Sequence, residues 1–107
     1  MLELNEEKAQ KLKEQYGNVA YVEATNGYLF FRRPTRVEYE RYQDKYASDS
    51  TKVRTHLKEL AVACLVEPDL AGFEAALNAE PTMLMSDVSP LLHDLAGDGR
   101  EKRKGKL

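Results

Sequence analysis

The sequence predicts a small α+β domain that is mostly helical: an N-terminal helix, one β-hairpin, then three or four helices packed against it. Three observations predict this class. Residues 19–32 contain two β-prone stretches separated by an Asn-Gly pair, which is a strong signal for a tight hairpin turn. Residues 35–97 carry apolar side chains at helical spacing. The length of 107 residues suits one domain, which we place at residues 1–97, followed by a basic tail at residues 98–107.

The first helix is expected over residues 4–16, where charged, helix-favouring residues predominate. Asn5 is its candidate N-cap, and Gly17 ends it as a left-handed cap. The hairpin follows over residues 19–32. Because an isolated two-stranded hairpin is marginally stable in water, it must pack on the helices or pair with another molecule.

The second helix is expected to begin after Pro34. Thr35 is its N-cap, and Glu38, three residues later, completes a capping box. The break at residues 48–50 ends this helix. Its apolar face is rich in tyrosine and consists of Val37, Tyr39, Tyr42 and Tyr46.

Two further helices are separated by Pro68. The earlier one has the clearest helical periodicity in the chain and is expected to end just before Pro68, since a residue that precedes proline disfavours helix. Asp69 caps the later one, which Pro81 ends. The apolar face of the earlier helix consists of Val53, Leu57, Leu60, Ala61, Cys64 and Leu65.

The last helix has two interpretations, which differ in where it begins. It either runs from Thr82 with a kink at Pro90, or starts at Ser86 and has Pro90 in or near its first turn. In both cases Gly97 closes it.

The sequence contains no recognisable catalytic or metal-binding pattern. Cys64 lies on an apolar helix face, so we expect a buried structural thiol. His93 and Asp94 are neighbours on a helix and do not face each other. Two histidines and one cysteine without paired spacing do not form a metal site, and no glycine-rich phosphate loop occurs. We therefore expect a protein that is not an enzyme and that needs no cofactor or metal.

Charge and hydropathy narrow the class of partner. Of the 16 basic and 18 acidic residues, five basic and two acidic ones lie at residues 98–107, so this tail is +3 and the other 97 residues are −5. We expect the tail to be disordered. An acidic body does not resemble a dedicated nucleic-acid-binding domain. The sequence contains neither an apolar run of membrane-spanning length nor a secretory signal pattern.

Two features of the sequence could contact a partner. Arg32 and Arg33 either grip carboxylates or phosphates of a partner, or pair with Glu38 and Glu40 nearby. The tyrosines either line the rim of the core or form part of an interface, where tyrosine is enriched. The candidate partner-binding residues are Tyr28, Phe30, Arg32, Arg33, Tyr39 and Tyr42.

The order of these features resembles bacteriophage tail assembly chaperones, the small proteins encoded near the tail tube and tape-measure genes. The resemblance covers most of residues 4–97, and its motifs are individually common. They are Tyr16-Gly17, the run from Tyr28 to Thr35, Glu38-Tyr39, Ala61 to Val66 followed by Glu67-Pro68-Asp69, Glu80-Pro81, and Leu95-Ala96-Gly97.

The resemblance implies a non-enzymatic role in tail morphogenesis. Such chaperones keep the tape-measure protein soluble while tail tube subunits polymerise around it, and they act in the host cytoplasm and are absent from the mature virion. The implied partners are therefore the tape-measure and tail tube proteins. One chain or a homo-oligomer could supply the grooves that cover apolar helices of such a client. The alternative is a small regulatory protein that binds nucleic acid through Arg32, Arg33, Arg36 and the basic tail; a small enzyme ranks last.

Overall fold

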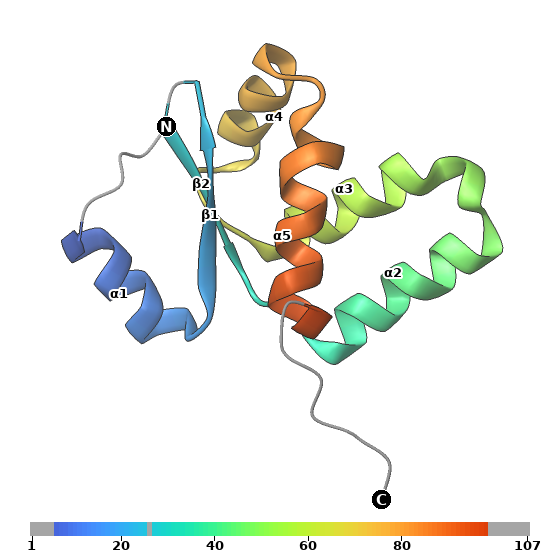
Figure 1. The fold of residues 1–107 in the computed structure, drawn as a ribbon, viewed down its shortest axis with the longest axis horizontal. Coiled ribbons are helices and arrows are strands. Elements are labelled where there is room, and N and C mark those ends of the chain that lie inside the picture. The colour runs from blue at the N-terminus through green and yellow to red at the C-terminus, as the bar shows by residue number, and fades with distance from the viewer. Residues whose placement is uncertain (1–5, 26, 99–107) are drawn as a thin grey trace, which may run out of the picture.

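The computed structural model describes residues 6–25 and 27–98, and within them a three-stranded antiparallel sheet separates one helix from the others (Figure 1). The expected α+β class, with an N-terminal helix, a hairpin and further helices, is confirmed. Three predictions fall outside the described residues: the Asn5 cap, the Asn26 turn position and the tail at residues 99–107. In chain order, the helices and strands are α1 (Glu6–Tyr16), β1 (Val19–Ala24), β2 (Gly27–Arg32), α2 (Arg36–Ser48), α3 (Val53–Cys64), β3 (Leu65–Glu67), α4 (Leu70–Ala79) and α5 (Ser89–His93).

The hairpin gives the sheet two different faces. Val22 is opposite Leu29 and Tyr21 is opposite Phe30. Because successive side chains of a strand point to opposite faces, the first pair faces the core and the second pair faces α1. The sheet order is β1-β2-β3, so β1 is an edge strand.

β3 corrects the predicted end of the third helix. That helix was expected to continue to the residue before Pro68, but α3 ends at Cys64 and Leu65–Glu67 pairs with β2. The backbone of Leu65 is already extended, with φ −65° and ψ 121°. Proline restricts only Glu67, the residue directly before it; Leu65 and Val66 are extended because pairing with β2 satisfies the backbone groups that leave the helix.

The predicted caps are confirmed where the structure describes them. Thr35 and Glu38 form a capping box at the start of α2. Gly17, with φ 78°, donates its N–H to the carbonyl of Lys13 at 2.8 Å and ends α1. Asp69 accepts the N–H of Gly72 at 2.9 Å at the start of α4.

The C-terminal segment is one helix that passes through Pro90. α5 continues wide helical turns at Leu84–Val88 and leads into Asp94–Asp98. The helix already includes Met83, and the N–H of Ser86 donates to the carbonyl of Thr82 at 3.0 Å, so the start near Thr82 is confirmed and the start at Ser86 is wrong. Pro90 has no N–H to donate, and the turn before it is wider than an α-helical turn. The N–H of Ser89 donates to the carbonyl of Leu84, which is five residues back and not four. Gly97, with φ 125°, ends the helix as predicted.

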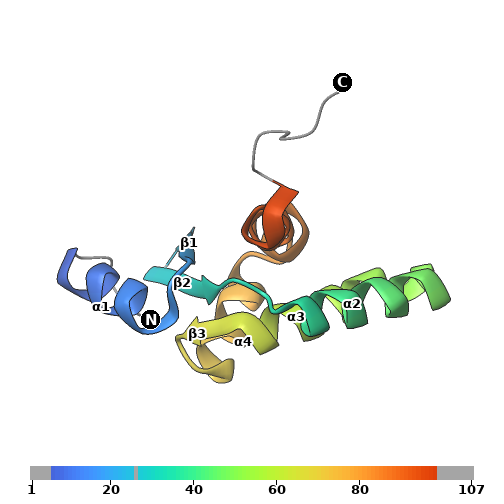
Figure 2. The ribbon, with the colours of Figure 1, turned by 90° about the horizontal axis from the view of Figure 1, so that it is seen from below.

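The core lies on one face of the sheet, between β1, β2 and the helices that follow them. Figure 2 shows α1 alone on one side of the sheet and α4 and α5 on the other. Phe31 and Phe73 meet edge to face at 5.9 Å between ring centroids, and both side chains are fully buried. Among residues 6–25 and 27–98, none of the helices combines the length and the hydrophobicity that spanning a lipid bilayer requires.

Candidate functional site

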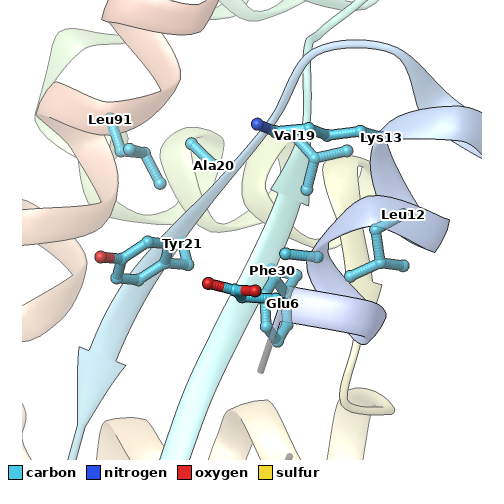
Figure 3. A pocket seen from close by; sticks show the side chains of 9 residues that line it. Glu6, Leu12, Lys13, Val19, Ala20, Tyr21, Phe30 and Leu91 are labelled. Atoms are coloured by element: carbon cyan, nitrogen blue, oxygen red, sulfur yellow. The ribbon is translucent and has the colours of Figure 1, made fainter. Parts of the chain in front are cut away.

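An open, mainly apolar groove lies between α1 and the sheet (Figure 3). Its volume is about 680 Å³. Residues of α1, β1 and β2 line it, together with one side chain from α5. Glu6 and Lys13 carry its charges. The lining residues are Glu6, Ala9, Leu12, Lys13, Val19, Ala20, Tyr21, Phe30 and Leu91.

The groove exists because α1 packs on the sheet through few side chains. Leu12, 5% exposed, is the buried residue of this helix. Lys8 forms an ion pair with Glu67 of β3 at 2.8 Å, and both side chains are about one third exposed. Ala9 is too small to fill the space beside them. The helix is therefore held on the sheet at a few points and leaves apolar surface uncovered.

The strands contribute an aromatic surface beside α1. The rings of Tyr21 and Tyr28 meet edge to face at 5.3 Å between centroids, and Tyr28 lies 6.5 Å from Phe30. Phe30 is buried yet lines the groove, whereas Tyr21 is 50% exposed. Of the predicted contact residues, Tyr28 and Phe30 thus lie at this face.

A second hollow continues the groove around the edge of β1. Its volume is about 460 Å³, and it shares Tyr21 and Leu91 with the groove. Within the part of the chain that the structure describes, its lining includes three carboxylates and no basic residue. These carboxylates belong to Glu23, Asp87 and Asp94.

Arg32 is at the junction of three elements. Its guanidinium donates to both carboxylate oxygens of Glu38 at 2.8 Å, and it also donates to the carbonyl of Ala63 near the end of α3 at 2.7 Å. The hydrogen bond from Arg32 lowers the pKa of Glu38 from its ordinary 4.5 to about 2. The pairing of Arg32 with Glu38, one of the two alternatives read from the sequence, is therefore present. Glu40 instead pairs with Arg36 at 2.6 Å.

The remaining predicted contact residues lie around α2. Arg33 is exposed and lines a shallow hollow together with Tyr39. Tyr39 and Tyr42 both pack their rings near His93 of α5, at 5.9 and 6.1 Å between centroids. Tyr42 is buried, and desolvation raises the pKa of its hydroxyl. The six predicted residues thus fall into three places: the sheet face beside α1, the Arg32 junction, and the α2–α5 contact.

Sequence reasoning missed most of the groove. Tyr21 could have been found, because it alternates with buried Val22 in a strand and so had to face the other side. Leu12 lies at helical spacing from Ala9 and Tyr16 in the first helix, but nothing in the sequence indicates that Leu91 would approach β1. Their meeting depends on how α1 and α5 pack, which local patterns do not encode.

The cysteine and the histidine that the sequence singled out lie in structural positions. Cys64 is fully buried, and desolvation raises the pKa of its thiol to about 11, so it is a poor nucleophile. Nδ1 of His93 lies 2.6 Å from the carbonyl oxygen of Ser89, so a backbone group of the same helix occupies this ring nitrogen. No group of three or more His, Cys, Asp or Glu side chains is placed to hold a metal ion among residues 6–25 and 27–98. The arrangement offers apolar surface and charge for binding.

Three comparisons place the chain among known proteins. The family described as "Domain of unknown function (DUF6848)" matches residues 12–103. No curated protein matches the sequence. The solved structure of the uncharacterised protein rbstp2171 from Bacillus stearothermophilus is similar, with a TM-score of 0.62 and 20% sequence identity over 90% of this chain and 99% of that chain. At this identity the likeness concerns the fold.

Proposed function

This chain belongs to the DUF6848 family, and we propose for it a non-catalytic role as an assembly chaperone that covers apolar segments of other proteins. The specific client class that we propose is the tape-measure and tail tube proteins of a bacteriophage tail. The resemblance of the sequence to tail assembly chaperones supports this client class. The open groove beside α1 is the observation that carries the proposal.

The groove has the properties that a protein-binding site needs. Its lining is apolar apart from Glu6 and Lys13, and it is open to solvent along α1. Apolar surface that is left exposed on a small domain commonly marks a binding site for another protein. A client with exposed apolar stripes, such as a long helical tape-measure protein, would bury them there.

The nucleic-acid alternative has less support from the side chains. Arg32 is committed to Glu38 and Ala63, and Arg36 pairs with Glu40. The hollow next to the groove is lined by carboxylates, which repel phosphates. Arg33 keeps an exposed guanidinium, but one arginine on an acidic body is a weak phosphate-binding surface.

Co-expression with the proposed client, the cognate tape-measure protein, tests the proposal. Wild type should co-purify with it and keep it in solution. Ala9→Glu places a longer, charged side chain in the apolar groove and should reduce the recovered complex at least about tenfold, because the carboxylate occupies apolar contact surface and loses water when the client covers it, even beside Lys13. Ala75→Glu, at an exposed position of α4, is the matched control and should bind like wild type.

Two results would remove the proposal. The first is no complex with either the tape-measure or the tail tube protein. The second is a complex that Ala9→Glu and Ala75→Glu affect equally.

The predicted arginine contact is tested separately, by Arg33→Glu alone. Changing Arg32 as well would break its ion pair with Glu38 and disturb the fold.

A further inference from the structure

We propose that the partner segment binds as an added β-strand on the free edge of β1, with apolar side chains toward α1 and basic side chains toward α5. This inference deepens the proposed function and rests on it. It names the conformation and the chemistry of the segment that the site takes: an extended stretch in which apolar and Lys or Arg residues alternate.

The backbone of β1 is available for such pairing. The N–H of Arg33 donates to the carbonyl of Asn18 at 3.0 Å, in line with the register of the hairpin. In an antiparallel ladder the hydrogen-bonded pairs alternate, so the outward-facing N–H and C=O groups belong to every second residue. These residues are Val19, Tyr21 and Glu23. Among the described residues, no group hydrogen-bonds to these outward amides or carbonyls.

The edge is accessible from both sides of the sheet. Figure 2 looks roughly along the strands and shows α1 on one side of β1 and α5 on the other. The groove of about 680 Å³ reaches β1 from the α1 side, and the hollow of about 460 Å³ lies between β1 and α5. Both include Tyr21 and Leu91, so they meet at the strand edge. A strand placed there would extend the sheet between two helical walls.

The two walls differ in chemistry, and this difference specifies the occupant. The α1 side offers Ala9, Leu12 and the ring of Phe30. The α5 side offers the carboxylates of Asp87 and Asp94. Side chains of a strand alternate between faces, so one added strand would present apolar residues to the first wall and basic residues to the second.

A strand fits this edge better than a helix does. A helix in the groove would cover the apolar wall but leave the outward amides of β1 without partners. Proteins usually protect such edges, and this chain does so at the hairpin turn, where Glu80 accepts the N–H of Thr25 at 2.8 Å. Among the described residues, that protection does not extend to Tyr21 or Glu23.

A short capped peptide that alternates lysine and valine is the probe. Tyr21→Pro and Tyr21→Ala form the matched pair: both remove the ring, but only proline removes the outward N–H. Proline is tolerated on an edge strand where its nitrogen faces away from the ladder. We expect Tyr21→Pro to bind the peptide about tenfold more weakly than Tyr21→Ala, because one hydrogen bond is lost and the peptide carbonyl is left unpaired.

Two measurements on the full wild-type chain keep the test independent of how Tyr21→Pro folds. Hydrogen exchange should show that the amides of Val19, Tyr21 and Glu23 gain protection when the peptide is added. A peptide N-methylated at the amides that face β1 should give no such protection.

The double variant Asp87→Asn/Asp94→Asn tests the basic side chains of the segment. It should bind the peptide more weakly than wild type, and its affinity should depend less on salt concentration.

Several outcomes would overturn the inference. They are equal binding by Tyr21→Pro and Tyr21→Ala, protection that arises without peptide and rises with protein concentration, and protection that is lost when residues 99–107 are removed. The last two would assign the edge to a second copy or to the chain's own C-terminal residues. If the tape-measure protein binds and Ala9→Glu abolishes this binding while the β1 amides stay unprotected, strand addition fails and the proposed function stands.

Discussion

At the scale of single residues, Arg32 illustrates why a basic pair in a sequence is a weak guide to a binding site. Its guanidinium joins the end of β2, the start of α2 and the end of α3 through Glu38 and the carbonyl of Ala63. Glu38 also accepts the backbone N–H of Thr35 at 2.9 Å, so one carboxylate both caps α2 and holds the arginine. The corner is therefore an internal connection between elements, and of the two arginines only Arg33 is exposed.

The Glu38 carboxylate should make stability depend on pH. Its pKa is about 2 in the folded chain against an ordinary 4.5, so its contribution is complete above about pH 4.5 and is lost as the pH falls toward 2. Glu38→Gln should lower the free energy of unfolding by about 1 kcal/mol at pH 7. Denaturant titrations of both proteins should show this difference shrinking between pH 4.5 and 2.

Glu40→Gln is the control for that series. Glu40 pairs with Arg36 on the surface of α2, where the two side chains are 50% and 88% exposed. We expect no measurable change in the free energy of unfolding, because water screens an exposed ion pair. A pH-independent difference between wild type and Glu38→Gln would contradict the account.

At the scale of elements, α1 packs on the rest of the described chain through little buried surface. Leu12 is the buried side chain of this helix, and the ion pair between Lys8 of α1 and Glu67 of β3 is partly exposed. By contrast, α3 buries Leu57, Ala61 and Cys64 completely. Helices that bury little apolar surface open at lower free energy than the rest of a domain. An element that opens easily beside a groove can adapt to what the groove binds.

Leu12→Ala should release α1 without unfolding the remainder. We expect the amides of α1 to exchange with solvent at least about tenfold faster, since the change removes about 2 kcal/mol or more of packing. Amides of α3 should be little affected. Hydrogen exchange resolved by residue measures both at once. An equal acceleration in α1 and α3 would show that α1 is part of one cooperative unit.

The contact between α4 and the loop that follows β3 depends on a glycine. A Cβ on Gly72 would lie 2.7 Å from Cγ and 2.8 Å from Cβ of Pro68. Alanine normally stabilises a helix by about 1 kcal/mol over glycine, but this clash with a rigid ring should outweigh the gain. Gly72→Ala should therefore lower the free energy of unfolding by about 1 kcal/mol, measured by denaturant titration.

The neighbouring exposed Ala71 supplies the reference for helix propensity. Ala71→Gly should lose about 1 kcal/mol through propensity alone. If Gly72→Ala raised the free energy of unfolding by as much as Ala71→Gly lowers it, the close approach of Pro68 would have no energetic consequence and this interpretation would fail.

At the scale of the whole molecule, local sequence patterns predicted most of the helices and strands but not the contacts between elements that are distant in the sequence. The hairpin, the Thr35–Glu38 box and the Gly17 cap follow from contacts within a few residues, and the structure confirms them. β3 was missed because a three-residue strand has no periodicity and forms only through pairing with β2. The groove was missed for the same reason, since Leu12, Tyr21 and Leu91 come together only when α1, β1 and α5 pack.

The molecule is elongated and thin, and the groove of the proposed function lies at one end of it. The chain measures 47 × 34 × 21 Å along its principal axes, and α2 and α3 extend together away from the sheet (Figure 1). The groove lies at the opposite end of the molecule, beside α1. Such a thin body offers much surface for its mass, which suits covering a larger protein.

Light scattering from the tape-measure protein, diluted out of denaturant, tests the central claim most directly. If this chain covers apolar surface of that client, wild type and Ala75→Glu should each suppress the scattering at a near-equimolar ratio. Ala9→Glu should fail to suppress it. Equal aggregation with and without wild type would contradict the account, as would equal suppression by all three proteins.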